Sequence, residues 1–535
     1  MKKLITLFLL TAILIGCAPS VTSAPRTTPS LDPIQVADHA AETDPAGWWR
    51  DAVFYEIFVR SFKDSDGDGI GDFNGITEKL EYLQELGVNA IWLMPIHPSP
   101  SYHGYDVLNY YDVNPEYGTL DDFRNLLNQA HQRDIRIIID LVLNHTSSQH
   151  PLFVDANSDP NSSFRDWYVW ADTPGNHWHE GNAGYYYGFF WEGMPDLNYR
   201  NPEVTDEMMK VTGFWLKDIG IDGFRIDAAK HLIEEGDRLE NTDTTHEWFK
   251  VFYTSYKAQK SDAYSVGEIY GAGAFLATKY RGQLDHIFNF ELASGIMNSV
   301  NGESNSGINS AWTFTLKDVS NGEYATFLTN HDQNRVMSVL NGNEDKAKLV
   351  AIMLLTSPGT PFIYYGEEIG MQGKKPDEDI RLPMQWSAET YAGFTTGNPW
   401  RALDTNYTQV NVAAQVDEPD SLLNLYRTLT KLRAEHPVLR TGSLTVLNTG
   451  NTGVYAILRA NTDEYILVLI NLKGIPVSEY GLSLTDKSLP NDTLSPLSLM
   501  DTTAFAPLEL RNGTFTDYKP VSILAPYQAY IIQLK

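Results

Sequence analysis

Eight apolar, strand-like segments alternate with helical patterns along the middle of the chain, and this alternation constrains the fold more than any other feature. The strand candidates are residues 53–60, 89–96, 136–144, 223–229, 264–270, 286–292, 324–330 and 360–368. Between them, apolar residues recur at helical spacing, as in Ile76, Leu80, Leu83 and Leu86. Alternating strands and helices build parallel sheets, and eight such units close a sheet into a barrel. The sequence therefore predicts a (β/α)₈, or TIM, barrel of the α/β class.

One connection is much longer than a barrel loop requires. Residues 144–198 follow the third strand candidate and are rich in Trp, Tyr, Gly, Asn and Pro. A loop of this length inside a compact domain usually has a function. We interpret residues 144–198 as an excursion domain after strand 3, beside the mouth of a barrel formed by residues 47–143 and 199–438. Its aromatic residues either line outer substrate subsites or form the core of the small domain.

The pattern changes after a helical segment at residues 421–436. Three segments, at residues 453–459, 464–471 and 522–534, show the short alternating pattern of strands. We expect residues 439–535 to form a C-terminal antiparallel β-sandwich. The chain of 535 residues is also too long for a single hydrophobic core, in agreement with several domains.

The N-terminus carries the features of a secretion signal. Residues 1–3 are positively charged, and residues 4–15 form an apolar run too short to span a bilayer comfortably. The run ends in Leu-Ile-Gly-Cys at Cys17, which resembles a bacterial lipobox, whose cysteine thiol takes a diacylglycerol. Residues 1–17 are therefore predicted to be a lipoprotein signal peptide, and residues 18–46 a flexible tether. The expected location is extracytoplasmic, with a lipid anchor in the bacterial cell membrane or outer membrane.

Composition restricts the partners that the protein can have. The formal net charge of −28 at pH 7 would repel nucleic acids and anionic lipid surfaces. Cys17 is the only cysteine, so no disulfide can form within one chain. We expect a monomer that meets its substrate and, through the acyl anchor, a lipid bilayer, but no nucleic acid.

Carboxylates stand at the ends of three strand candidates. The ends of the fourth, fifth and seventh carry Asp227, Glu268 and Asp332. Reactive groups in such barrels lie at the C-terminal ends of the strands, so the three are expected to converge at one mouth. A single Asp at a strand end is more often a helix cap or an ion-pair partner. Three converging carboxylates instead fit cleavage of a glycosidic bond through an oxocarbenium-like transition state.

The sequences around these carboxylates form an ordered set of five short motifs. They are D-L-V-L-N-H at 140–145, M-P-D-L-N at 194–198, G-F-R-I-D-A-A-K-H at 223–231, G-E-I-Y at 267–270 and F-L-T-N-H-D-Q-N-R at 327–335. This set resembles the signature regions of the α-amylase family of glycoside hydrolases, family 13. The motif M-P-D-L-N is typical of a group intermediate between oligo-1,6-glucosidases and neopullulanases. Together with the lipobox, it suggests a bacterial lipoprotein α-amylase of that group.

The resemblance implies a role for each carboxylate. Asp227 is the expected nucleophile, which forms a covalent glycosyl ester with net retention of configuration. Arg225 lies two residues earlier on the same strand face, where its charge would keep that carboxylate ionised. Glu268 is the expected general acid and then base, which requires a raised pKa. Asp332 is expected to hold hydroxyls of the distorted sugar.

The same resemblance implies a set of sugar-binding side chains. An aromatic ring is expected to stack on the sugar at the cleavage point, and hydrogen-bond donors to surround it. These side chains are Tyr105, His145, Lys230, His231, His331 and Arg381. The pair Lys230-His231 resembles the pair found after the nucleophile in family members that act on α-1,4 bonds.

A short acidic loop after the first strand candidate is a candidate calcium site. Its expected ligands are Asp64, Asp66, Asp68, the backbone carbonyl of Ile70, and Asp72. The spacing is similar to that of an EF-hand loop, but position 12 is Gly75, so the bidentate Glu is missing. The alternative is an acidic turn without metal. We favour calcium because four aspartates in nine residues would repel one another without a cation.

A second structural calcium is implied by the resemblance alone. Asn144 and Asp196 match positions at which family members bind an ion between the barrel and the excursion domain. Both ions are expected to be structural, far from any Lewis-acid chemistry.

These features together predict a retaining enzyme that cleaves internal α-1,4-glucosidic bonds of starch, maltodextrin and related α-glucans. An α-glucosidase, a neopullulanase-like enzyme or a 4-α-glucanotransferase acting on maltooligosaccharides is the alternative within the same chemistry. A non-catalytic glucan-binding protein is a more distant alternative, since fold alone does not fix function.

Overall fold

The computed structural model describes residues 45–271, 274–318, 322–486, 489 and 491–535. Cys17, the predicted signal peptide and residues 18–44 of the predicted tether lie outside the described residues. Within the described part of the chain, no helix is long and apolar enough to cross a membrane.

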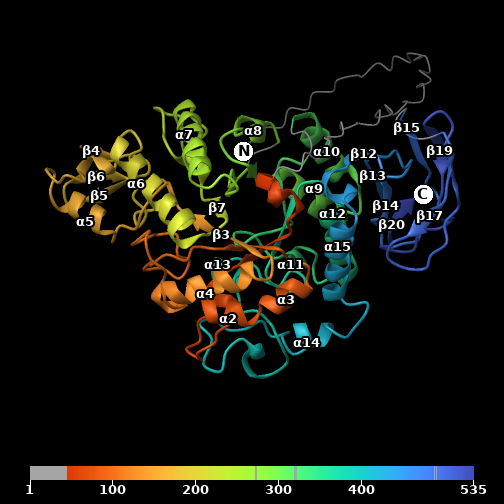
Figure 1. The fold of residues 1–535 in the computed structure, drawn as a ribbon, viewed down its shortest axis with the longest axis horizontal. Coiled ribbons are helices and arrows are strands. Elements are labelled where there is room, and N and C mark those ends of the chain that lie inside the picture. The colour runs from red at the N-terminus through yellow and green to blue at the C-terminus, as the bar shows by residue number, and fades with distance from the viewer. Residues whose placement is uncertain (1–44, 272–273, 319–321, 487–488, 490) are drawn as a thin grey trace, which may run out of the picture. The chain divides into compact units, whose positions relative to one another are not determined.

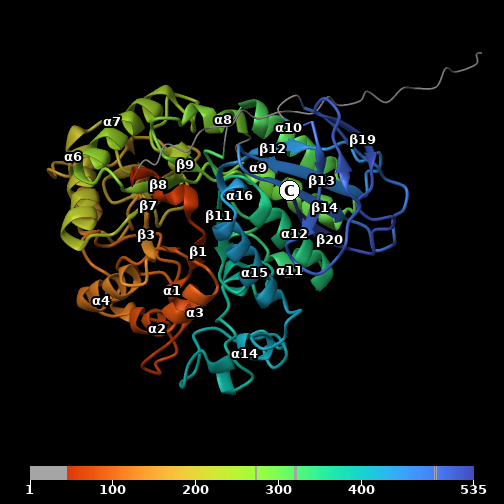
Figure 2. The same cartoon turned by 45° about the vertical axis from the view of Figure 1, so that its right-hand side comes forward.

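Eight parallel strands form the barrel (Figures 1 and 2). They are β1 (Phe54–Ile57), β2 (Ala90–Leu93), β3 (Arg136–Leu141), β7 (Gly223–Ile226), β8 (Tyr264–Gly267), β9 (His286–Ile287), β10 (Ala325–Thr326) and β11 (Thr360–Tyr364). They are ordered β10-β11-β1-β2-β3-β7-β8-β9, and a parallel bridge between Phe288 and Ala325 joins the two ends of the sheet. Each strand lies within one of the eight predicted ranges, so the predicted (β/α)₈ barrel is confirmed.

Successive side chains along each strand point alternately into and out of the barrel, which determines the residues that fill its interior. Phe54 on β1 points inward and stacks on Phe362 of β11, with ring centroids 4.3 Å apart. Glu56 lies two residues later and therefore points to the same side, but nearer the C-terminal mouth. Aromatic and aliphatic residues thus fill the lower barrel, whereas charged side chains gather at its upper end.

Helices surround the strands (Figure 2). The longer ones around the barrel are α2 (Phe73–Glu78), α3 (Leu80–Glu85), α4 (Leu120–His131), α6 (Pro202–Gly213), α7 (Asp243–Gln259), α8 (Ala274–Lys279), α9 (Phe290–Asn301), α10 (Ser306–Asp318), α12 (Glu344–Thr356) and α15 (Leu422–Glu435). Shorter turns of helix are α1 (Val59–Phe62), α11 (Val336–Val339), α13 (Asp377–Ile380), α14 (Val412–Gln415) and α16 (Val438–Thr441).

Local sequence explains how several helices begin and end. Thr119 caps α4 and forms a capping box with Asp122, which satisfies free backbone N–H groups. Ser421 caps α15, in agreement with the predicted helix at 421–436. The helical pattern at Ile76–Leu86 does not form one helix, because the backbone leaves helical geometry at Lys79, between α2 and α3.

The segment 144–198 contains a helix and a small sheet of its own. These are α5 (Pro151–Ser158) and an antiparallel sheet of β4 (Trp170–Ala171), β6 (Gly184–Tyr187) and β5 (Trp178–Gly181). An isolated bridge from His145 to Asp196 connects the beginning and end of the segment, and one from Tyr168 to Leu197 connects its middle to its end. Trp167 is buried in the core, whereas Trp191 is 45% exposed and lines a cavity.

A C-terminal antiparallel sheet follows the barrel. Its order is β12 (Ser443–Val446), β13 (Val454–Ala460), β14 (Tyr465–Asn471), β20 (Ala529–Leu534) and β17 (Pro496–Ser498). Two further pairs, β15 (Leu482–Thr485) with β19 (Thr514–Tyr518) and β16 (Thr493–Leu494) with β18 (Leu508–Glu509), complete the strands of this domain. The predicted antiparallel C-terminal domain is thus confirmed, and its three predicted strands are β13, β14 and β20.

Strand β13 is buried on both faces. Tyr455 and Ile457 belong to the barrel core, and Trp312 of α10 donates a hydrogen bond of 2.9 Å to the Tyr455 hydroxyl. Val454 and Leu458, on the other face, belong to the core of the C-terminal domain. The C-terminal sheet therefore packs directly on the helices of the barrel.

Candidate active site

The structure brings the three predicted carboxylates together at the mouth of the barrel. Asp227 follows β7, Glu268 follows β8 and Asp332 lies in the loop after β10. All three line one cavity of about 330 Å³. Tyr105, His145 and Arg381 line the same cavity, as does Trp191 from the excursion segment.

Arg225 is the centre of this arrangement. Its Nη1 atom donates to Asp227 Oδ1 and to Asp140 Oδ1, each at 2.7 Å. Its Nη2 atom donates to Glu268 Oε2, also at 2.7 Å. Arg225 is only 1% exposed, so these ion pairs form away from bulk water. The sequence analysis paired Arg225 with Asp227 alone and missed Asp140, although Asp140 begins one of the five motifs.

Burial and crowding shift the pKa values of these groups. Burial raises the pKa of Asp227 and of Glu268, the negative charge of Asp332 adds to the effect on Glu268, and Arg225 opposes it on both. Burial also raises the pKa of Asp140, to about 6. Asp332 behaves differently: burial is outweighed by the charges of His331, Arg381 and Arg225, so the pKa of Asp332 is lowered. Asp332 therefore ionises most readily. For Asp140, Asp227 and Glu268, burial favours the protonated form and the ion pairs with Arg225 favour the ionised form.

The backbone after β7 supports the same geometry. Ala228 adopts φ 45°, in the left-handed region that residues other than glycine rarely use. Its N–H donates to Glu268 Oε2 at 3.3 Å. Such a conformation costs free energy and is often found where side chains must be aimed at a ligand.

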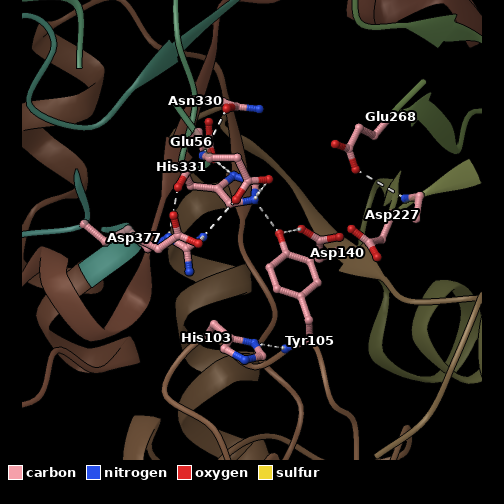
Figure 3. A network of polar contacts seen from close by, with 12 residues as sticks. Glu56, His103, Tyr105, Asp140, Asp227, Glu268, Asn330, His331 and Asp377 are labelled. Carbon is pink, nitrogen blue, oxygen red and sulfur yellow. Dashed lines mark hydrogen bonds and ion pairs between the residues drawn. The ribbon is translucent and has the colours of Figure 1, made fainter. Parts of the chain in front are cut away.

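A second group of contacts lies opposite the Asp227–Glu268 pair (Figure 3). Arg381 donates to Asp332 Oδ1 at 2.8 Å and to the backbone carbonyl of His331 at 2.9 Å. The Tyr105 hydroxyl lies 2.7 Å from His331 Nε2 and 3.3 Å from Asp140 Oδ2, and its ring stacks on that of His331. Glu56, which the sequence analysis did not identify, lies on the other side of the His331 ring.

His145 reaches the cavity from the end of β3. It is 1% exposed, and neither of its ring nitrogens has a hydrogen-bond partner among the described residues. A buried imidazole without partners is costly unless a ligand completes its hydrogen bonds. The structure thus presents His145 toward the space that a ligand would fill.

Lys230 and His231 line an adjoining cavity of about 370 Å³ that shares Glu268 and Asp332 with the first. Aromatic rings that the sequence analysis missed also line it. Phe189 stacks on His231 with centroids 4.0 Å apart, and Tyr270 is 57% exposed. The two cavities together form a continuous lining of rings, carboxylates and basic groups, which is the chemistry that sugar rings and hydroxyls require.

The acidic loop places three of the predicted calcium ligands together. Carboxylate oxygens of Asp64, Asp66 and Asp72 lie within 4.8 Å of one another. Asp68 lies outside this group, and Ile70 has only its backbone carbonyl to offer. Burial raises the pKa of Asp68, and Asp66, Asp64 and Asp72 add to the effect, so the loop has negative charge that a cation would offset. This donor set fits Ca²⁺, which prefers carboxylate and carbonyl oxygens.

The second predicted calcium position also fits a cation. Both side-chain polar atoms of Asn144 and the Oδ2 atom of Asp196 are buried without a hydrogen-bond partner among the described residues. The same is true of Glu234 Oε1 and the Tyr187 hydroxyl. Burial raises the pKa of Asp196, and the nearby charge of Glu234 adds to the effect. A cation would satisfy these oxygens. Glu234, a second carboxylate beside Asp196, was not among the residues predicted for this position.

Comparison with known proteins agrees with this geometry. A model of the α-amylase catalytic domain matches residues 56–442. α-Amylase 3 of Dictyoglomus thermophilum is 44% identical over 438 residues, which cover 80% of this chain and 86% of the relative. An oligo-1,6-glucosidase of Heyndrickxia coagulans is 34% identical over 521 residues, which cover 81% of this chain and 93% of the relative.

A solved structure extends the likeness to three dimensions. The crystal structure of an α-amylase from H. orenii superposes with a TM-score of 0.79 at 40% identity, and the match covers 90% of this chain and 99% of that one. The family match begins within β1 and spans the other seven barrel strands, the excursion segment and the loops that carry the three carboxylates. The chain therefore belongs to the α-amylase family and is a glycoside hydrolase of family 13.

Proposed function

We propose that the protein is a retaining α-amylase that cleaves internal α-1,4-glucosidic bonds of starch, maltodextrin and related α-glucans. The observation that carries this proposal is the bridge that Arg225 makes between Asp227 and Glu268, opposite Asp332 and Arg381. The 44% identity to a relative named α-amylase 3 supports the α-1,4 preference.

The spacing of the two bridged carboxylates supports retention of configuration. Ile226 on β7 pairs with Gly267 on β8, so Asp227 and Glu268 are neighbours just beyond the ends of adjacent strands. Both carboxylates also accept from the one guanidinium of Arg225, each at 2.7 Å, so the two carboxyl groups lie close together. Retaining glycosidases hold their two carboxyl groups about 5–5.5 Å apart, whereas inverting enzymes need about 6.5–9.5 Å to admit a water.

In the first step, Asp227 attacks the anomeric carbon while Glu268 gives its proton to the glycosidic oxygen, which leaves with the departing chain. In the second step, Glu268 as a carboxylate removes a proton from water, and the water oxygen displaces Asp227 from the sugar. Burial raises the pKa of Glu268 and the charge of Asp332 adds to the effect, which favours the protonated form that the first step needs. Asp332, whose pKa is lowered, is an acceptor for sugar hydroxyls throughout.

An α-glucosidase, a neopullulanase-like enzyme or a 4-α-glucanotransferase is the second candidate. The 34% identity to an oligo-1,6-glucosidase favours it, and the motif M-P-D-L-N points in the same direction. The two candidates use the same carboxylates. They differ in the number of glucose units that the site binds on each side of the bond to be cleaved. A purely glucan-binding protein is the least supported alternative, because Asp227, Glu268 and Asp332 are all present.

The proposal also covers bound calcium ions, the location of the protein and its oligomeric state. We propose that Asp64, Asp66 and Asp72 bind one structural Ca²⁺, and that Asn144 and Asp196, joined by Glu234, bind a second one. When bound, these ions would supply charge compensation to the fold and no chemistry to the reaction. We also propose a monomer that is held at the outer face of a bacterial membrane by acyl chains on Cys17.

The product pattern tests the main proposal. Protein lacking residues 1–46 should rapidly shorten soluble starch to mixed maltooligosaccharides, and the first reducing ends should be α-anomers. Glu268→Gln should lower kcat/KM by about 10³-fold, because general acid catalysis is lost, whereas Glu435→Gln on the surface of α15 should not. Chromatography and ¹H NMR of the products measure both effects. Release of single glucose units or longer transfer products would favour the second candidate, and an unaffected Glu268→Gln would contradict both.

Removal of calcium tests the metal sites. A ligand that binds only the folded state stabilises it by about 2.7 kcal/mol at a concentration of 100 times its Kd. Chelation should therefore lower the melting temperature of the wild type, and Asp64→Asn should make part of this calcium dependence disappear. Asp463→Asn, an exposed aspartate far from both sites in sequence, is the control. An unchanged melting temperature after calcium removal verified by metal analysis would contradict the sites.

The pH profile tests the assignment of the general acid. The positive charge of Lys230 lowers the pKa of Glu268, in opposition to burial. Lys230→Met should raise that pKa further, so the acid stays protonated longer and the alkaline limb of kcat/KM should move to higher pH. Lys210→Met, on the exposed side of α6, should leave the limb in place. A shift of the limb to lower pH in Lys230→Met would show that another group controls it.

A further inference from the structure

Glu56 is a buried carboxylate at the active site that the proposed reaction does not use. It points inward from β1 and is 2% exposed. Its Oε1 atom lies 2.5 Å from Nδ1 of His331, which is itself completely buried (Figure 3). A contact this short between two buried groups places a proton between them, whichever of the two holds it more tightly.

The other nitrogen of the same ring lies beside Tyr105 and Asp332, two residues that line the ligand cavity. His331 Nε2 lies 2.7 Å from the Tyr105 hydroxyl and 3.3 Å from Asp332 Oδ2. An ionised Asp332 can only accept hydrogen bonds, so a lone pair on Nε2 would repel it, whereas an N–H group would be attracted. Tyr105 can then accept from Nε2 and donate its own proton to Asp140 Oδ2 at 3.3 Å. The geometry therefore favours a hydrogen on Nε2.

The contacts at Nδ1 and Nε2 together indicate how many protons the Glu56–His331 pair holds. If Nε2 carries one proton and a second lies between Nδ1 and Glu56, the Glu56–His331 pair holds two protons and has no net charge. The charged and polar groups that face the pair are Asp140, Asp332, Arg225, Arg381, Lys375, Tyr105 and Tyr364. Burial raises the pKa of Glu56, with Asp332 and Asp140 adding to the effect and Arg225 opposing it, in agreement with a pair that keeps its protons.

We propose that Glu56 is a positioning residue that occupies His331 Nδ1 and thereby fixes a hydrogen on Nε2. His331 donates this hydrogen to the Tyr105 hydroxyl in the free enzyme and to a hydroxyl of the sugar at the cleavage point when substrate is bound. This inference rests on the proposed function for the identity of the ligand. It does not require Glu56 to touch the substrate, since the residue acts only through the imidazole.

The proposed role of Glu56 predicts different effects for its replacement by Gln and by Leu. In Glu56→Gln, the amide can donate an N–H to Nδ1, which leaves the hydrogen on Nε2 as in the wild type. In Glu56→Leu, Nδ1 loses its partner, and a buried neutral imidazole is free to carry its hydrogen on Nδ1 instead. Neither Gln nor Leu can carry a charge at position 56, so a difference between the two variants reports hydrogen placement alone.

Steady-state kinetics on soluble starch provide the first test. Loss of one donor to the transition state costs about 10²-fold, so kcat of Glu56→Leu should fall by about that factor, with little change in KM, while Glu56→Gln stays within about fivefold of the wild type. Ile57→Val, a neighbouring change on β1 that points away from the cavity, is the control for disturbance of the strand. Equal losses in Glu56→Gln and Glu56→Leu, or no loss in Glu56→Leu, would overturn the inference.

A spectroscopic test does not depend on activity. In protein labelled with ¹⁵N-histidine, with His331→Gln used to assign the resonances, Nε2 of His331 should be protonated in the wild type and in Glu56→Gln. In a folded Glu56→Leu it should shift toward the unprotonated range. An unprotonated Nε2 in the wild type would refute the inference. A wild type with protonated Nε2 but no action on any α-glucan would instead refute the proposed function.

Discussion

Burial of one guanidinium among three carboxylates is the constraint on which the rest of the active site depends. Moving a carboxylate out of water costs several kcal/mol unless a partner compensates. Arg225 compensates three at once, since Asp140, Asp227 and Glu268 each lie 2.7 Å from its nitrogens. One positive charge cannot balance three negative ones, so such a cluster tends to keep a proton. A retained proton is what the proposed general acid needs, and the proposed nucleophile needs the direct ion pair.

The barrel supplies these contacts through strand register. Asp140 on β3 lies opposite Arg225 on β7, and Glu56 on β1 lies opposite Trp92 on β2, all with side chains in the same inner layer. Trp92 donates to Asp140 Oδ2 at 3.2 Å and packs edge-on against the His331 ring. The layer just below the mouth therefore holds the catalytic groups in place through strands, which are more rigid than loops.

The fold and much of the site could be predicted from the sequence because they follow from local patterns. The alternation of strands and helices gave the barrel, and the position of Asp227, Glu268 and Asp332 at strand ends gave their convergence. Contacts that depend on register between distant strands could not be predicted. Glu56 lies in an apolar strand with no motif around it, and its contact with His331 joins residues 275 positions apart. Glu234 was missed for a similar reason, since its neighbours Asn144 and Asp196 come from other parts of the chain.

The central claim is that the carboxylate beside Arg225 becomes covalently bound to the sugar. The most direct measurement is to incubate the protein with a 5-fluoro-α-glucosyl fluoride, which slows the second step, and to identify the labelled peptide by mass spectrometry. The account predicts one glycosyl group per chain, attached to Asp227, and no labelling in Asp227→Asn. A label on Glu268, or turnover of the fluoride with inversion and without a trapped ester, would contradict it.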